Sequence, residues 1–333
     1  MPANTVRTRQ PLRLAVLTES PPAPIVLDSV IPRRYVHKAA QAEVLLSDWR
    51  KVDEDTFVVA AQWPRAHAFY SSDDGLYDPL LLAETVRQTI PLLSHVAYDV
   101  PFGHHLIWEF FSYEVDTAAL VVGATPADVE LRIACHDITR RRNGLSALTM
   151  QVAVIRDGAT LGTATARFTS NAPAIYRRLR AGSSDPAEAI ARAIAVPPPV
   201  VPVRAGRDRF LDVVLSPADE PYRWQLRTDT DHPVLFDHPV DHAPGMLLLE
   251  AVRQAMHAIS YPRRGVLVGL DTVFTRYAEL DAPCWIEATD IREDASGRTT
   301  ARVTALQHDQ VLFTAVATSE PRPSAVGVHD RSA

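Results

Sequence analysis

The sequence element FDHPVDHAPGMLLLEAVRQA, residues 236–255, has a shorter relative, DPLLLAETVRQT, at residues 78–89. Aligning Glu84 with Glu250 superimposes ETVRQ on EAVRQ without a gap. Each element is an apolar run followed by polar residues at helical spacing, which is typical of a largely buried helix. The repetition predicts that the chain contains two copies of one domain.

Matches on both sides of these helices support a duplication. Upstream, HAFY at residues 67–70 lies near HPVLF at residues 232–236. Downstream, ACHDI at residues 134–138 aligns with ATDIR around Asp290. A chance match of one nonapeptide would not bring ordered matches with it, whereas a duplicated domain keeps the order and varies the loops.

Both copies have the same predicted order of elements: two strands, one apolar helix and a meander of strands. The expected helices span residues 80–95 and 246–261, and Pro91 is expected to kink the first. The expected strands are 43–46, 56–62, 110–115, 128–138, 146–155 and 160–169 in the first copy, and 212–215, 223–226, 266–278, 284–292, 298–307 and 310–318 in the second. This order predicts an α+β fold in which a curved antiparallel sheet wraps around a central helix. Pairing the two sheets edge to edge would remove one exposed edge from each.

A Pro- and Ala-rich stretch, AIAVPPPVVPV at residues 193–203, predicts a stiff connection between the copies. The predicted organisation is a loosely ordered arm at 1–33, a first domain at 34–175, a linker at 176–203, a second domain at 204–322 and a tail at 323–333.

The composition narrows the classes of function. The chain of 333 residues is 47% hydrophobic, which is typical of a globular protein. Its net charge of −6 argues against the broad cationic surface of nucleic-acid-binding proteins. No apolar run reaches the roughly 18 residues that span a bilayer, and the N-terminus lacks a secretory pattern. Cys135 and Cys284 are too few for a disulfide framework. We therefore expect a cytoplasmic protein that binds neither nucleic acid nor membrane.

Three polar residues follow the apolar run in each helix. Because residues three and four apart share a helical face, each set forms a cluster. On an exposed helix such a cluster is worth about 0–1 kcal/mol, but on a buried helix its charges cost several kcal/mol unless they are paired or used. Two interpretations remain open, a structural cluster of polar residues between the copies and a functional site. The sequence favours a functional site for the second set. The sets are Glu84, Arg87 and Gln88, and Glu250, Arg253 and Gln254.

The second helix also has a distinctive entrance, Pro244-Gly245. Proline suits the start of a helix, and glycine lets another chain approach the backbone closely. The free N–H groups around Gly245 and Met246 carry partial positive charge. They are therefore candidates for polarising a thioester carbonyl and stabilising the oxyanion formed on attack.

The pattern Pro-Gly-x-Leu-x-x-Glu-Ala-x-x-Gln resembles the central helix of hotdog-fold thioester enzymes such as acyl-carrier-protein dehydratases. Together with VHKAAQAEVLLSDW at 36–49, FGHH at 102–105 and DVVLSP at 212–217, both helical elements resemble the A-factor synthase (AfsA-type) family. The resemblance covers about residues 35–318. It implies two tandem hotdog domains, and an enzyme that joins a β-ketoacyl group from acyl carrier protein to the hydroxyl of dihydroxyacetone phosphate. The resulting ester is the precursor of γ-butyrolactone or furan-type signalling molecules, and no metal or redox cofactor is required.

The loop before the second helix departs from the dehydratase pattern. Dehydratases place a catalytic histidine nine residues before the glycine at the helix entrance, where this chain has Phe236. His238 and His242 lie seven and three residues before Gly245, so the loop is shorter and simple dehydration is in doubt. With His232 they resemble a metal cluster, but their loop setting favours hydrogen bonds to the loop backbone instead. The carboxylates of Asp237 and Asp241 then restrain the loop.

For the implied reaction, the candidate general base is Glu250, because a carboxylate within hydrogen-bond reach can take the hydroxyl proton. Arg253 is the candidate for binding the phosphate or orienting Glu250, since a guanidinium offers a bidentate fork. The N–H groups at Gly245 and Met246 are the candidate oxyanion site, and Gln254 is a candidate for positioning substrate.

The first set and the loop have less definite roles. Glu84, Arg87 and Gln88 form a second site, a phosphate contact or an inert copy, and His238 is a candidate substrate-binding residue. Exposed arginines near the site, Arg263, Arg264 and Arg276, are candidates for docking the carrier protein or are simply solvent-facing.

Two rival functions stay open. One is a thioesterase or dehydratase of the same fold, and the other is a non-catalytic acyl-ligand-binding protein. The partners implied by the first reading are β-ketoacyl carrier protein and dihydroxyacetone phosphate. The two hotdog domains pair within the chain, and a further homodimer is open.

Overall fold

The computed structural model describes residues 30–70, 75–141 and 144–322. The predicted tail and most of the predicted N-terminal arm therefore lie outside the described residues. Short 3-10 turns flank the larger elements at Arg33–Val36, Gln41–Glu43, Thr117–Leu120, Pro202–Ala205 and Phe210–Asp212. Among the described residues, no helix is long and apolar enough to cross a membrane.

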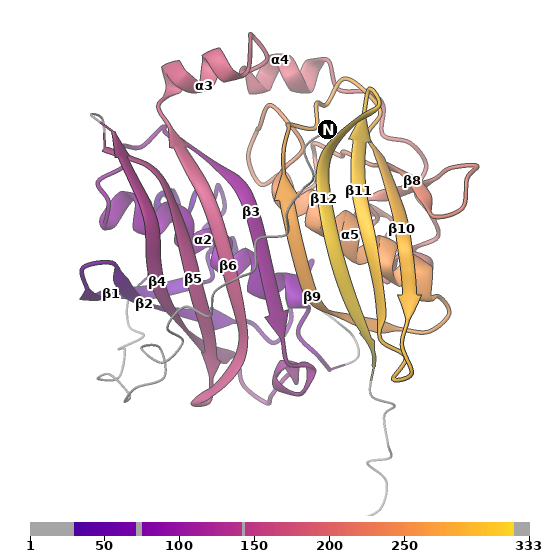
Figure 1. The fold of residues 1–333 in the computed structure, drawn as a ribbon, viewed down its shortest axis with the longest axis horizontal. Helices are drawn as coiled ribbons and strands as arrows, with labels where there is room; N and C mark the ends of the chain where they lie inside the picture. Colours follow the sequence, from indigo (N-terminus) through magenta and orange to yellow (C-terminus); the bar gives the residue numbers. More distant parts are fainter. Residues whose placement is uncertain (1–29, 71–74, 142–143, 323–333) are drawn as a thin grey trace, which may run out of the picture.

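The described residues form one twelve-stranded sheet in the order β1-β2-β4-β5-β6-β3-β9-β12-β11-β10-β8-β7 (Figure 1). The first half contains β1 Leu46–Asp53, β2 Thr56–Trp63, β3 His105–Val115, β4 Ala127–Arg141, β5 Gly144–Arg156 and β6 Ala159–Asn171. The second half contains β7 Leu215–Pro217, β8 Arg223–Leu226, β9 Gly265–Phe274, β10 Trp285–Glu293, β11 Thr299–Gln307 and β12 Gln310–Pro321. Read outward from the centre, both halves have the same strand order, so the sheet is pseudo-symmetric.

The two halves join where β3 pairs antiparallel with β9, from Phe110 opposite Val273 to Glu114 opposite Gly269. This confirms the predicted edge-to-edge pairing. The join also buries Thr272, whose hydroxyl donates to the carbonyl of Phe111. Each half thereby loses one free edge, and the pair becomes a single continuous sheet.

One long helix from each half lies on the same face of the sheet, behind it in Figure 1. They are α2, Pro79–Val96, and α5, Gly245–Ser260, each within one residue of the predicted bounds. Both bury most of their residues, as predicted from their apolar runs. α2 continues through Pro91 as one helix. These elements confirm the predicted α+β fold, a sheet packed around central helices.

A fine detail of the sheet repeats between the halves. Asp137 on β4 and Asp290 on β10 both have positive φ, 50° and 52°. Each sits at an irregularity in the pairing with the next strand, β5 or β11. These are the positions that the downstream sequence match aligned, so the two copies share a β-bulge.

The strands expected at 43–46 and 212–215 are wrong. Each segment begins on the last residue of a 3-10 turn, Glu43 or Asp212, and the strand starts only at the segment's final residue, Leu46 or Leu215. The reason is that the backbone N–H of Leu45 donates to Gln88 instead of to a neighbouring strand. In the second copy, the N–H of Val214 donates to Gln254 in the same way.

The linker is more structured than a proline-rich connection alone predicts. It carries two short helices, α3 Pro173–Leu179 and α4 Pro186–Ala191, which lie along the top of the molecule in Figure 1. Asp185 caps α4 by accepting from two backbone N–H groups. The buried side chain of Tyr176 attaches α3 to the second copy through Asp241. The predicted boundary at 175 falls inside α3, and the one at 204 follows the end of α4.

Candidate active site

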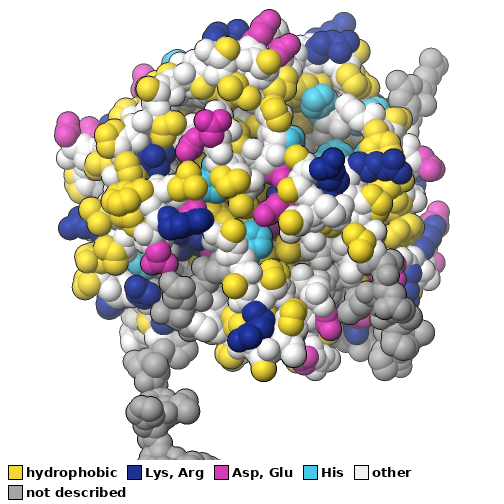
Figure 2. All heavy atoms as spheres, turned by 180° about the vertical axis from the view of Figure 1, so that it is seen from behind, with side chains coloured by type: hydrophobic (Ala, Val, Ile, Leu, Met, Phe, Trp, Pro, Cys, Tyr) yellow, Lys and Arg dark blue, Asp and Glu magenta, His cyan; other side chains and the backbone are white. Residues whose placement is uncertain are grey.

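A cavity of about 890 Å³ opens between the two copies. Figure 2 shows the corresponding face, opposite the one seen in Figure 1, where histidine and apolar side chains gather around a central hollow. Its lining comes from α2, from β3, from the loop before α5 and from the first turn of α5. Ile90, Ile107, Trp108, Val234 and Phe274 supply apolar wall that suits an acyl chain.

The first polar set borders this cavity. Glu84 is 2% exposed and accepts from Nε and Nη2 of Arg87 at 2.8 and 2.9 Å and from Gln88 at 2.9 Å. The ammonium of Lys38 lies 3.1 Å from the same carboxylate. Burial would raise the pKa of Glu84, but Arg87 and Lys38 lower it to about 2.

Two cations therefore share one ion-pair partner at the first set. In the part of the chain that the structure describes, Glu84 is the carboxylate that forms ion pairs with Lys38 and Arg87. Asp237 borders the same cavity and acts electrostatically on both cations, but its two oxygens accept from the backbone N–H groups of Ala39 and Ala40 at 2.7 and 3.3 Å and form no direct ion pair with either cation. The cations thus keep capacity for a further anion at the cavity wall.

The entrance of α5 borders the same cavity. Pro244 is the N-cap residue and supplies no side-chain hydrogen bond, so the first-turn N–H groups of Gly245 and Met246 are uncapped. Gly245 packs under an aromatic wall: a Cβ atom built on it would lie 3.0 Å from Trp108 and 3.6 Å from Phe274. Glycine here lets the aromatic ring and the backbone come this close.

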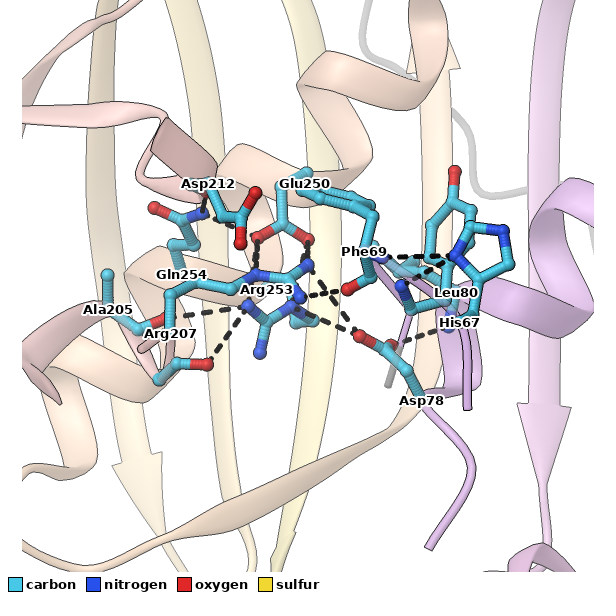
Figure 3. Close-up of polar contacts among 12 residues, drawn as sticks. His67, Phe69, Asp78, Leu80, Ala205, Arg207, Asp212, Glu250, Arg253 and Gln254 are labelled. Carbon is cyan, nitrogen blue, oxygen red and sulfur yellow. Dashed lines mark hydrogen bonds and ion pairs between the residues drawn. The ribbon is translucent and has the colours of Figure 1, made fainter. Parts of the chain in front are cut away.

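The second polar set is closed, as Figure 3 shows. Glu250 is 0% exposed and accepts from Nε and Nη2 of Arg253 at 2.9 and 2.8 Å. It also accepts from Nε and Nη2 of Arg207 at 2.9 and 2.7 Å, and from Gln254. Burial would raise the pKa of Glu250, but Arg207 and Arg253 lower it to about 2. A carboxylate with five donors and this pKa is a weak proton acceptor at neutral pH.

Asp78 completes the closure of the second set. Its side chain caps α2 by accepting from the N–H of Leu80 at 2.9 Å. The same carboxylate lies 3.7 Å from Nη2 of Arg207 and 3.8 Å from Nε of Arg253 (Figure 3). Two guanidinium groups therefore face two carboxylates, and the adjoining cavity measures only about 70 Å³.

The two sites are related by the pseudo-symmetry of the sheet. At each site, the N-terminus of one helix faces the Glu/Arg set of the other helix. The alignment of Glu84 with Glu250 places Asp78 opposite Pro244, so the copies differ at the residue that caps the helix. An aspartate closes one site, and a proline leaves the other open.

The predicted site residues are thus brought together in a different combination. Gly245, Met246 and His238 share the large cavity with Glu84 and Arg87, and Arg253 borders the small one. Glu250 borders neither. Gln88 and Gln254 are 0% exposed. Each glutamine amide is occupied by its own helix glutamate and by backbone groups of the preceding turn, as the bonds at 2.5 to 2.9 Å show.

The loop histidines have separate environments. Nδ1 of His232 accepts from the N–H groups of Val234 and Leu235, so this ring is bonded to its loop backbone. His238 lies at the large cavity, with Nδ1 3.2 Å from Asp237. The described residues hold no group of three or more histidine, cysteine or acidic side chains arranged to bind a metal ion.

Sequence reasoning missed the partners Lys38, Arg207 and Asp78. Lys38 and Arg207 stand at similar places in the two copies, because each precedes the helix that carries its glutamate by nearly the same length of chain. Two basic residues at equivalent places before two buried glutamates were a usable signal. Asp78 carried a second signal, because an aspartate before a proline is a strong helix cap.

The model of the A-factor biosynthesis hotdog domain matches residues 24–171 and again residues 187–322. The chain belongs to this family. It is 43% identical over 287 residues to the 2-oxo-3-(phosphooxy)propyl 3-oxoalkanoate synthase of Streptomyces virginiae, covering 86% of this chain and 96% of the relative. The synthase of the same name from Streptomyces coelicolor is 40% identical over 286 residues, with 85% and 89% coverage.

A solved structure supports the hotdog fold. The 12:0-ACP thioesterase from Umbellularia californica superimposes with a TM-score of 0.51 at 10% identity, covering 80% of this chain and 94% of the thioesterase. At this identity the likeness concerns the fold alone. The predicted tandem hotdog architecture is thereby confirmed.

The closed cavity makes stability depend on pH. His257 lines it and is 7% exposed, and burial together with the charge of Arg253 lowers its pKa from 6.5 to about 4. The pKa of His257 is lower in the folded state than its ordinary value. The stability that neutral His257 contributes is therefore complete above pH 6.5 and is lost as the pH falls towards 4. Between these pH values, we expect the free energy of unfolding measured in urea to rise with pH. We expect His257→Gln to reduce that slope by up to about 1.4 kcal/mol per pH unit. His308→Gln, in the turn after β11, is the control, and equal slopes in all three proteins would contradict the expectation.

Proposed function

We propose that this protein is an acyltransferase that joins a 3-oxoacyl group to a hydroxyl of dihydroxyacetone phosphate. The donor in this proposal is a 3-oxoacyl thioester of acyl carrier protein. The product is the phosphooxy ester after which the Streptomyces relatives are named. It would serve as the precursor of a γ-butyrolactone or furan-type signalling molecule.

The observation that carries the proposal is the uncapped entrance of α5 at the large cavity. A thioester carbonyl placed there would accept hydrogen bonds from the N–H groups of Gly245 and Met246. Those bonds strengthen as the carbonyl oxygen becomes an oxyanion, so they lower the barrier to attack. The apolar wall around Trp108 and Phe274 gives the acyl chain a water-poor environment.

The phosphate of the acceptor is assigned to Lys38 and Arg87. These two cations share the carboxylate of Glu84 as their ion-pair partner beside the cavity. A phosphate dianion supplies the further negative charge, and a guanidinium binds phosphate with a bidentate fork. In this account Glu84 holds both cations in place. Water as acceptor, which would give a thioesterase, makes no use of these cations.

Three roles remain predictions from the sequence: Glu250 as general base, Arg253 as phosphate ligand and Gln254 as substrate contact. Their bonds are all made within the protein, and Asp78 supplies the negative charge that a phosphate would bring. We therefore assign the reaction to the open site, and the closed set to structure.

Pro244→Asp tests both the reaction and its location. The new carboxylate would cap α5 as Asp78 caps α2, so we expect an equal or higher melting temperature and a loss of activity of at least about 10²-fold. Activity is measured by mass spectrometry of the products from 3-oxoacyl carrier protein and dihydroxyacetone phosphate. Pro244→Ala, which adds no cap, should keep most of the activity.

Three results would contradict the proposal. A free 3-oxo acid or an enoyl product from the unaltered protein would make it a thioesterase or a dehydratase. No turnover at all would make it an acyl-ligand-binding protein. Full activity in a folded Pro244→Asp protein would place the reaction away from the entrance of α5.

Arg87→Lys and Arg253→Lys separate the two polar sets. We expect Arg87→Lys to raise KM for dihydroxyacetone phosphate about tenfold, because lysine keeps the charge and loses the fork. The rate with phosphate-free dihydroxyacetone should be unchanged. Arg253→Lys should lower the melting temperature and leave KM for the phosphorylated acceptor unchanged. The opposite pattern would place the phosphate-binding site at the second set, which contains Arg253.

A further inference from the structure

A histidine–aspartate pair, His242 and Asp241, borders the open site and is separate from the groups assigned above to the oxyanion and the phosphate. Nδ1 of His242 lies 2.8 Å from Oδ1 of Asp241, and both residues line the large cavity. His242 stands three residues before Gly245, on the short approach to α5. With the carboxylate ionised, Nδ1 carries the proton and donates it to Asp241. Nε2 therefore keeps a lone pair and can accept a proton.

The aspartate of this pair is fixed by the linker. Asp241 is 4% exposed, and both its oxygens accept from the hydroxyl of Tyr176 at 2.8 Å. Nε of Arg180 donates to Asp241 at 2.9 Å, and Arg180 also forms two bonds to Glu279. Burial would raise the pKa of Asp241, but His242, Tyr176 and Arg180 together lower it. The carboxylate thus stays ionised and cannot rotate freely.

The linker residues are held in turn by stacked rings. Tyr176 stacks on His105 with their ring centroids 3.6 Å apart. Tyr277 meets the edge of His242 at 4.7 Å and lies under the guanidinium of Arg180 at 4.2 Å. A structural connection alone would not need to present this fully bonded network to a cavity wall.

The closed site lacks the pair. When the two copies are aligned on Glu84 and Glu250, Gly75 and Leu76 stand opposite Asp241 and His242. Neither of those residues can accept or donate a proton through its side chain. The pair therefore accompanies the uncapped helix entrance, and both are missing from the copy that Asp78 closes.

We propose that His242 is the general base of the acyl transfer and that Asp241, Tyr176 and Arg180 are its positioning residues. The inference rests on the proposed function and adds the group that moves the proton. Nε2 of His242 takes the proton of the acceptor hydroxyl as its oxygen attacks the thioester carbon. The oxyanion is held by the N–H groups at the entrance of α5. The C–S bond then breaks, the imidazolium returns the proton to the leaving thiolate, and ester and thiol result with His242 neutral again.

Titratable and charged groups face His242 from several elements. They are Asp241, Tyr277 and His105, with the guanidinium of Arg180 behind the aspartate. Removing the Tyr176 hydroxyl concentrates the negative charge on Asp241. The imidazolium is then stabilised more strongly, and the acid limb of the rate profile should move to higher pH.

The test is the pH dependence of kcat/KM for ester formation in His242→Asn and Tyr176→Phe. Asparagine can still donate to Asp241 but cannot act as a base. We expect His242→Asn to lose about 10²–10⁴-fold in kcat, to lose the acid limb and to keep its melting temperature. We expect Tyr176→Phe to keep most of its kcat, with the acid limb moved upward by several tenths of a pH unit. His136→Gln, a histidine paired with Asp137 on β4 and outside both cavities, is the control that keeps full activity.

The outcomes separate this inference from the function it rests on. If the unaltered protein makes the ester and folded His242→Asn makes it at an undiminished rate, His242 is not the base. An unmoved acid limb in Tyr176→Phe would make the linker contact structural only. If the unaltered protein makes a different product, the proposed function fails first, whatever the variants do.

Discussion

The ion pairs of Asp78 with Arg207 and Arg253 determine which of the two sites is closed and which is left open. The carboxylate satisfies an N–H group at the start of α2 and balances two guanidinium groups that share the carboxylate of Glu250. Removing one member of a buried charged cluster costs about 3–5 kcal/mol, so the contact is costly to break. At the equivalent position of the second copy, the side chain of Pro244 provides neither a charge nor a hydrogen-bond acceptor. The helix entrance and the cation pair on that side are left for a ligand.

The duplicated fold makes this asymmetry possible. A single hotdog unit buries its helix against its own sheet but leaves a sheet edge exposed. Pairing β3 with β9 removes that edge and sets two helices side by side, each with its entrance beside the polar set of the other. Two sites are then available from one chain. One site can become structural while the other keeps an open cavity, and the linker helix α3 reaches the open site through Tyr176.

Much of the fold could be predicted from the sequence. The apolar runs located both helices to within one residue, and the sequence match aligned Asp137 with Asp290, although the bulge that they share was not predicted. The combination of residues at the site could not be predicted so directly. Gly245 and Glu250 lie on one helix, so five residues separate them by about 7.5 Å along the axis and by more than a third of a turn around it. A residue at the helix entrance therefore shares a cavity with the glutamate of the other helix. Which residues share a cavity depends on tertiary packing and on the ion pairs that Asp78 forms with arginines far away in the sequence.

Only one of the two pseudo-equivalent sites is open to a ligand. The most direct test of this asymmetry is the number of molecules of a non-hydrolysable 3-oxoacyl thioester analogue that one chain binds, counted by native mass spectrometry and by calorimetric titration. We expect one molecule to bind per chain. Two molecules bound per chain with equal affinity would contradict it.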